Sequence, residues 1–208
     1  MINKNFLQEA SLLQLSEEIF STVINDRVEL NSIQNLLTEK VKEAETINFI
    51  LADGLGYKNL ISLETSLKEN IKKIINTTFP SSTNVALTTF AMMRNPIDHG
   101  ILGYYMYDRN KFGLINALNW NNENKSLLGN NHFKNQESIW KKLKSLNTHV
   151  SNFQPENLVG SALSNFLYEK SSTVPYKTLD NLIEMLSEAS FLENRFNFIY
   201  YPNVDIAG

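Results

Sequence analysis

The chain has 208 residues, of which 42% are hydrophobic and 20% are charged, as in an ordinary globular protein long enough to bury a sizeable core. The formal net charge is −3 and no long basic run occurs, which excludes the electrostatic footprint of a general nucleic-acid binder. The absence of cysteine excludes disulfides, thiolate zinc ligands and a cysteine nucleophile.

The N-terminal segment is predicted to be helical. Apolar residues recur at helical spacing between Phe6 and Ile24, and a second helix is predicted from Ser32 to Ala44. Polar side chains interrupt the first stretch, so it lacks the apolar region of a signal peptide, and no run approaches the ~20 apolar residues of a membrane span. We therefore expect a cytoplasmic protein in which residues 1–44 form a helical segment ahead of the main domain.

Strands and helices alternate along the rest of the chain. Strands are predicted at residues 47–52, 74–78, 148–153 and 196–202, with two short β-like runs inside 99–120. Helices are predicted at residues 58–70, 82–93, 137–147, 155–167 and 179–192. This alternation predicts an α/β fold with a mostly parallel sheet that is covered by helices on both faces.

Oxygen-bearing side chains follow three of the predicted strands. Asp53 ends the first strand, the turn "FPSSTN" at residues 79–84 follows the second, and Asp205 follows the last. In parallel sheets ligands bind beyond the carboxyl ends of the strands, so we expect these side chains to share one edge. Taken alone, each acid is equally an ordinary turn or capping residue.

The serine- and threonine-rich turn at residues 79–84 offers a hydroxyl at a helix N-terminus. The helix dipole and the free backbone N–H groups there favour an anion such as a phosphate. The alternative is that Ser81, Ser82 and Thr83 only cap the helix. A hydroxyl is a weak nucleophile without a base or a metal, and no GxSxG motif is present. The histidines His99, His132 and His149 show no diagnostic spacing, so the chemistry would need a metal.

Four stretches together resemble the alkaline phosphatase superfamily, and within it the type I phosphodiesterase / nucleotide pyrophosphatase family. They are "FILADGLGY" at 49–57, "TTFPSSTNVALTTF" at 77–90, "PIDHGILGYYMY" at 96–107 and "FIYYPNVDIAG" at 198–208. Their order and spacing carry the resemblance, which spans about residues 46 to 208. It implies an alkaline-phosphatase-like three-layer sandwich, with residues 45–208 as the N-terminal part of a catalytic domain that continues past the end of this chain.

The resemblance also implies a site with two divalent metal ions, with zinc as the expected metal and manganese as the alternative. Asp53 matches the first metal-ligand aspartate of the family, Thr83 matches the nucleophile that also contacts the metals, and Asp205 matches an aspartate that binds the other metal. The implied activity is hydrolysis of phosphodiester or pyrophosphate bonds in small, nucleotide-like phosphate esters, through a covalent phospho-enzyme intermediate.

Two departures from the family pattern affect these expectations. Tyr104 stands where many nucleotide pyrophosphatases have a phosphate-holding asparagine, which makes it a candidate substrate-binding residue and leaves the substrate open. The histidine that the family places after Asp205 would follow Gly208, and the later metal ligands are absent from the sequence. We therefore expect the chain to be a piece of a longer enzyme, with doubtful activity alone.

Three other functions remain open from the sequence. One is a phosphomonoesterase or phosphomutase of the same superfamily, or a hydrolase of phosphonate or sulfate esters, although the absent cysteine argues against a typical sulfatase. A second is a degenerate domain that only binds a partner or a nucleotide. The last is an α/β domain with unrelated chemistry.

Overall fold

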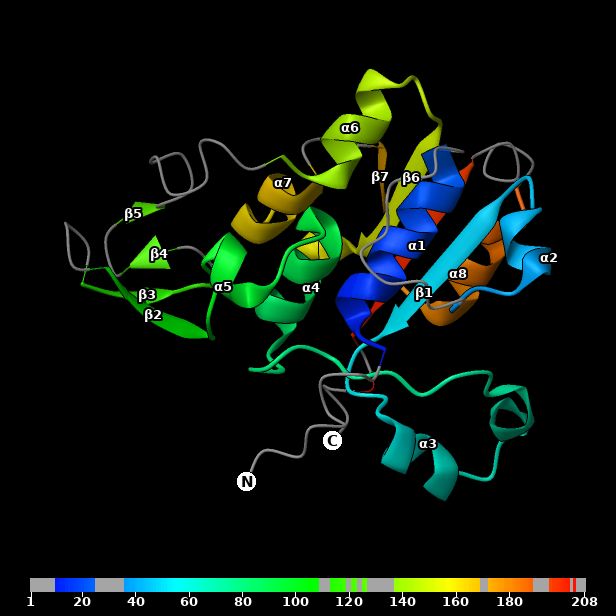
Figure 1. Cartoon of the computed structure of the whole chain (residues 1–208). Helices are drawn as coiled ribbons and strands as arrows, with labels where there is room; N and C mark the ends of the chain where they lie inside the picture. Colours follow the sequence, from blue (N-terminus) through cyan, green and yellow to red (C-terminus); the bar gives the residue numbers. More distant parts are fainter. Residues whose placement is uncertain are drawn as a thin grey trace.

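The computed structural model describes residues 10–24, 36–108, 113–118, 121–122, 125–126, 137–168, 172–188, 195–202 and 204. Its centre is a four-stranded parallel sheet with the strand order β1-β8-β6-β7 (Figure 1). These strands are Ile47–Ala52 (β1), Phe196–Tyr201 (β8), Val150–Pro155 (β6) and Ser172–Tyr176 (β7). A smaller antiparallel sheet consists of Tyr105–Asp108 (β2), Gly113–Asn116 (β3), Asn121–Asn122 (β4) and Lys125–Ser126 (β5). The smaller sheet lies beyond the helices, to the left in Figure 1.

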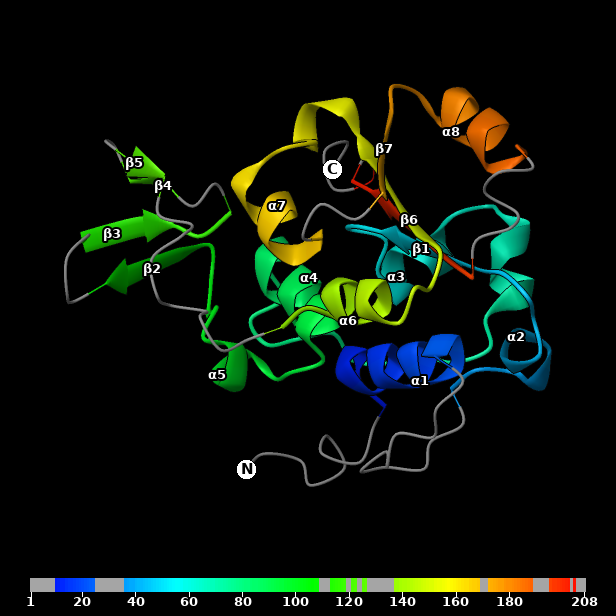
Figure 2. The ribbon, with the colours of Figure 1, turned by 90° about the horizontal axis from the view of Figure 1, so that it is seen from above.

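Helices cover both faces of the central sheet, which gives three layers (Figure 2). One face packs against Leu12–Ile24 (α1), Thr83–Met92 (α4), Ile139–Ser145 (α6) and Ala162–Tyr168 (α7), and Leu179–Leu186 (α8) packs on the other. Parallel strands buried in this way read as continuous apolar runs, as β1 and β8 do. The predicted α/β fold with a parallel sheet between two helical layers is confirmed.

Aromatic side chains fill the core on the face of the sheet that carries α4. Phe196 and Phe198 of β8 contact Trp140 of α6, and Phe90 of α4 packs against Phe198 at a ring-centroid distance of 5.4 Å. These side chains are almost fully buried, so they exclude water over the length of the strand. The packing fixes α4 against the middle of the sheet.

Helix α1 belongs to the same core. Its Phe20 contacts Phe90 and Trp140 with ring centroids 5.4 and 5.8 Å apart. Two residues before Phe20, the buried carboxylate of Glu18 accepts hydrogen bonds from the backbone N–H groups of Leu36 and Leu37. The domain boundary placed at residue 44 stays a prediction.

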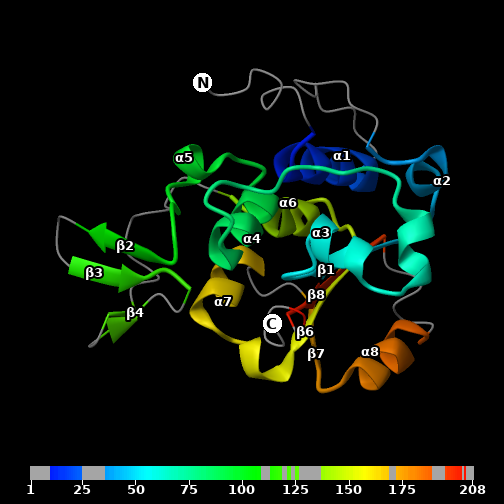
Figure 3. The same cartoon turned by 90° about the horizontal axis from the view of Figure 1, so that it is seen from below.

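The structure differs from the predicted elements at several places. Residues 74–78 form no strand of either sheet, because their pairing is limited to one bridge between Ser11 and Asn76. The predicted helix at 58–70 divides into Tyr57–Ser62 (α3), beside the carboxyl end of β1, and the 3-10 turn Ser66–Asn70 (η2) (Figure 3). Within 36–44 only Glu39–Lys42 (α2) is helical. Strand β7 was missed, because a serine, a threonine and a proline interrupt its apolar character.

The predicted helix at 155–167 is also divided, because Glu156–Leu158 forms a 3-10 turn (η3) between β6 and α7. Pro96–His99 forms a short helix (α5) that was not predicted. The two β-like runs inside 99–120 are β2 and β3, which pair with Tyr105 opposite Asn116. Among the described helices, none has the length and apolar character to cross a membrane.

Candidate functional site

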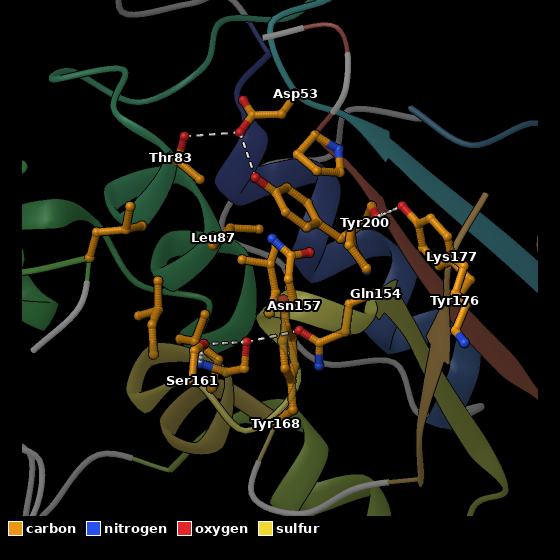
Figure 4. Close-up of a pocket in the computed structure, with 17 residues that line it drawn as sticks. Asp53, Thr83, Leu87, Gln154, Asn157, Ser161, Tyr168, Tyr176, Lys177 and Tyr200 are labelled. Carbon is orange, nitrogen blue, oxygen red and sulfur yellow. Dashed lines mark hydrogen bonds between the residues drawn. The ribbon is translucent and has the colours of Figure 1, made fainter. Parts of the chain in front are cut away.

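Asp53 lies directly after β1, at the carboxyl edge of the central sheet. Its backbone N–H donates to the carbonyl of Tyr201 at 2.9 Å, which extends the β1–β8 ladder by one residue. Gly54 follows with a φ of 79°, a conformation that favours glycine and turns the chain sharply toward α3. The ladder and the turn together hold the Asp53 carboxyl group at the mouth of a pocket (Figure 4).

Thr83 is the first residue of α4 and faces Asp53. Ser82 occupies the N-cap position and its carbonyl accepts from the N–H groups of Val85 and Ala86, but its hydroxyl makes no capping hydrogen bond. The Thr83 hydroxyl donates to Asp53 Oδ2 at 2.9 Å. The hydroxyl of Thr83 therefore points toward the site, which disfavours the interpretation of this turn as a simple helix cap.

A second hydroxyl reaches the same carboxylate oxygen. Tyr200 of β8 donates to Asp53 Oδ2 at 2.8 Å, and its ring is almost buried. Tyr176 of β7 in turn donates to the backbone carbonyl of Tyr200 at 2.7 Å. Two donors thus share Oδ2, and among the described residues none donates to Oδ1. Asp53 is held in one orientation with one oxygen left to accept a ligand.

The pocket beside Asp53 and Thr83 has a volume of about 400 Å³. Its walls mix aromatic and aliphatic side chains with a few polar groups from β6, η3 and α7 (Figure 4). The polar groups that line it away from Asp53 include Gln154, Asn157, Ser161 and Ser164. A concave, largely apolar pocket with a few polar groups beside a reactive pair is the usual form of a small-molecule site.

Two of the tyrosines that line the pocket are held in their neutral form. Burial raises the pKa of Tyr168 well above its usual range. Burial, and to a lesser degree the neighbouring Tyr201, raises the pKa of Tyr176 to about 12. Both phenols keep their protons at neutral pH and therefore add no negative charge to the pocket.

The described residues supply part of a metal site. Asp53 Oδ1 and the Thr83 hydroxyl are oxygen donors of the kind that divalent cations accept, so the donor set fits a metal in its chemistry. Within the described ranges no group of three or more His, Cys, Asp or Glu side chains could hold a metal ion. Asp205, the third predicted ligand, lies outside the described residues.

The other residues considered in the sequence do not line the pocket. Tyr104 is partly exposed and packs against Tyr105, although the loop that carries it is tied to α4 by a hydrogen bond of 2.8 Å from Asn84 Nδ2 to the carbonyl of Gly103. Its role in substrate binding stays a prediction. His99 is buried in a hydrogen bond with Thr89, and His132 lies outside the described residues.

Tyr200 and Gln154 were not among the predicted site residues. Their part in the site depends on contacts between strands that are far apart in the chain, and periodicity cannot show such contacts. The one available signal was chemical: a hydroxyl or an amide inside an apolar strand needs a hydrogen-bond partner.

One of the comparisons with known proteins gave a match, and it covers most of the chain. A family model described as type I phosphodiesterase / nucleotide pyrophosphatase matches residues 49–208, a range that includes Asp53, Thr83 and Tyr200. Neither the comparison with curated proteins nor the comparison with solved structures gave a match.

Proposed function

The chain belongs to the type I phosphodiesterase / nucleotide pyrophosphatase family, and on that premise we propose that it hydrolyses phosphodiester or pyrophosphate bonds of small, nucleotide-like substrates with Thr83 as the nucleophile. The observation that supports this role best is the hydrogen bond from the Thr83 hydroxyl to Asp53 at the mouth of the pocket. Membership of this family supports an activity as a phosphate ester hydrolase, and the assignment of the nucleophile is our proposal.

The geometry suggests how the chain's own residues would act. The Thr83 O–H points at Asp53 Oδ2, so the lone pairs of the hydroxyl oxygen are directed elsewhere and can meet a phosphorus atom in the pocket. In the first step the Thr83 oxygen forms a bond to phosphorus and passes its proton to Asp53 Oδ2, while the bond to the leaving oxygen breaks and the leaving group takes a proton from solvent.

A water molecule would complete the cycle. Its oxygen attacks the phosphorus of the phosphothreonine and releases a proton to solvent, the bond to the Thr83 oxygen breaks, and Thr83 takes back the proton held by Asp53. The N-terminus of α4 is oriented so that its first N–H groups favour the phosphoryl oxygens in both steps. Tyr200 keeps Asp53 fixed throughout, because its hydroxyl donates to Oδ2.

Divalent metal ions are part of this proposal, with zinc as the first candidate and manganese as the second. Asp53 and Thr83 would hold them, together with Asp205 as a further ligand that lies outside the described residues. When bound, such ions lower the pKa of a hydroxyl and neutralise negative charge on the phosphate. The organic part of the substrate would lie in the pocket between Tyr168 and Tyr200.

The test compares Thr83→Ala with Thr83→Ser in the full chain, incubated with zinc or manganese and bis(p-nitrophenyl) phosphate. We expect slow turnover by the wild type, because this chain carries only part of the expected metal ligands, with measurable turnover kept in the serine variant and lost in the alanine variant. Mass spectrometry of enzyme quenched during turnover should find the phosphoryl adduct on Thr83. Unchanged turnover in Thr83→Ala would remove Thr83 from the nucleophile role.

The same assay distinguishes the other functions left open by the sequence. Faster cleavage of p-nitrophenyl phosphate than of the diester would indicate a phosphomonoesterase. A folded chain that binds neither zinc nor manganese and cleaves neither ester would indicate a non-catalytic binding domain.

A further inference from the structure

Gln154 presents an amide group in the wall of the pocket. It lies in β6, its side chain is only 2% exposed, and it lines the pocket that contains Asp53 and Thr83. A buried amide needs partners for both its oxygen and its nitrogen, because an unpaired polar group inside a protein costs about 1–3 kcal/mol. What the two ends of this amide contact therefore determines what else it can bind.

The oxygen of Gln154 is already occupied. The hydroxyl of Ser164 in α7 donates to Gln154 Oε1 at 2.8 Å, and the hydroxyl of Ser161 donates to the oxygen of Ser164 at 2.9 Å (Figure 4). Ser161 is itself anchored, since its oxygen accepts the backbone N–H of Ser164 at 3.2 Å. This relay starts at the backbone of α7 and presents a hydroxyl donor to the amide, so the oxygen of Gln154 faces Ser164.

The nitrogen of Gln154 is the end that remains. Among the described residues none accepts a hydrogen bond from Nε2, although the residue is almost fully buried. Several polar atoms of the protein are fully enclosed and have no hydrogen-bond partner, but Gln154 Nε2 is not one of them. This is expected of a nitrogen that faces the pocket and not the packed core. The wall of the pocket thus offers an N–H donor in a fixed orientation.

We propose that Gln154 determines specificity by donating a hydrogen bond from Nε2 to an acceptor on the organic group of the substrate. The inference rests on the proposed function, because it assumes that the phosphate lies at Thr83 and the organic group lies in the pocket. Tyr168 and Leu167 are among the apolar residues that line the pocket. The preferred organic group is therefore planar or apolar, and carries a carbonyl oxygen or a ring nitrogen at its edge.

Binding of two phosphate monoesters to the zinc-loaded full chain tests this inference. Uridine 5′-monophosphate carries ring carbonyl acceptors, and ribose 5-phosphate has the same sugar phosphate without the ring. We expect the wild type to bind the uridine compound more tightly in calorimetry. Gln154→Met keeps the length of the side chain and removes the amide, so it should weaken uridine 5′-monophosphate binding about tenfold and leave ribose 5-phosphate binding unchanged.

Ser164→Ala supplies a second, milder variant. It leaves Gln154 in place but removes the hydroxyl that holds Oε1, so the amide group can rotate. The preference for the uridine compound should then fall by about threefold. Thermal unfolding of each variant checks that the fold is kept, and Ser164→Ala carries the test if Gln154→Met does not fold.

Several outcomes would overturn the role of Gln154. For Gln154→Met, these are an equal loss of affinity for both ligands or no loss for either. For the wild type, they are equal affinity for ribose 5-phosphate and the uridine compound, or no binding of either. Failure of the proposed hydrolysis looks different. In that case the ligand preference and its loss in Gln154→Met remain, but Thr83→Ala cleaves esters as fast as the wild type does.

Discussion

Helix α4 carries two threonine hydroxyls that each pair with a titratable side chain at 2.9 Å. Thr83, at the start of the helix, donates to Asp53 and lines a pocket, whereas Thr89, further along, pairs with the buried His99. Thr89 and His99 are each 1% exposed, so no substrate reaches them. The comparison teaches that a hydroxyl beside an ionisable group becomes a candidate site only where a ligand can approach it.

The two pairs also differ in what holds the titratable partner. His99 Nδ1 accepts the backbone N–H of Ile101 at 3.1 Å, so the neutral ring carries its hydrogen on Nε2 and donates it to Thr89. Both ring nitrogens are then satisfied within the protein. Asp53 has Oδ2 occupied by two donors and Oδ1 without a donor among the described residues, so it retains the capacity to bind a ligand.

The largest expected effect comes from removing the charge of Asp53 in the pair that faces the pocket, Thr83 and Asp53 (the open pair). Asp53→Asn keeps the size of the side chain and an acceptor for Thr83, but it removes the carboxylate that would hold a metal. Turnover of bis(p-nitrophenyl) phosphate should fall at least about a hundredfold, since even partners of metal ligands matter by 10- to 100-fold. The midpoint of urea unfolding should change little. Wild-type turnover in this variant would contradict the proposed role of Asp53.

The pair of Thr89 and His99 (the buried pair) should instead control stability, and the free energy of unfolding should therefore depend on pH. Burial lowers the pKa of His99 to about 4, and the adjacent Asp98 opposes part of this shift. The pKa of a histidine in the unfolded chain is ~6.5, so the contribution of His99 to the free energy of unfolding is fully present above that pH. The stabilisation should then be lost, by about 3 kcal/mol, as the pH falls from about 6.5 toward 4.

Urea unfolding of the wild type and of His99→Gln at a series of pH values measures this contribution. Carboxylates also titrate over part of the range, and the neutral glutamine variant subtracts their effect. A difference between the two proteins that does not change with pH would rule out His99 as the source.

A smaller effect is expected from the hydroxyl of the buried pair. Thr89→Val leaves His99 Nε2 without an acceptor, which should lower the free energy of unfolding by about 1–3 kcal/mol without changing turnover. Thr88→Val is the matched control, because Thr88 is equally buried and, within the described part of the chain, its hydroxyl bonds only to the carbonyl of Asn84 in the same helix. Equal destabilisation by the two variants would mean that the pair with His99 contributes nothing specific.

The smallest effect sharpens the description of the open pair. Tyr200→Phe removes one of the two donors to Asp53 Oδ2 and keeps the ring that fills the core. Turnover should fall by up to about tenfold, because Asp53 is no longer held in one orientation. The measurement is the turnover rate of the purified variant. Its thermal unfolding checks that the fold is kept. A rate equal to that of the wild type would show that Thr83 alone positions the carboxylate.

Local sequence pattern predicted the elements that are mostly apolar, and it failed where pairing with another strand determines the structure. β1 and β8 were predicted almost to the residue, because each is apolar apart from one asparagine. Residues 74–78 also favour a strand, with two isoleucines and two threonines, but they pair only through one bridge and form no strand of a sheet. Composition shows that a segment can be a strand, but whether it becomes one depends on the neighbours that the fold brings to it.

The proximity of Asp53 and Thr83 was expected from the rule that ligands bind at the carboxyl ends of parallel strands. The expectation was correct for this pair, although the strand assumed to precede Thr83 does not exist. Thr83 is positioned instead by the packing of α4, whose Phe90 stacks on Phe49 of β1 with the ring centroids 4.8 Å apart. The position of Asp205 at the same edge stays a prediction.

The pairing of β1 with β8 has a consequence for synthesis of the chain. Tyr200 and Asp53 are separated by 147 residues, and β8 is the neighbour of β1 in the described sheet. A ribosome adds about 5–20 residues per second, so roughly 7 to 30 s pass between the two. During that interval α4 is available to cover the apolar face of β1, since Phe90 emerges long before β8. The nascent chain can therefore shield β1 early, whereas the site itself forms last.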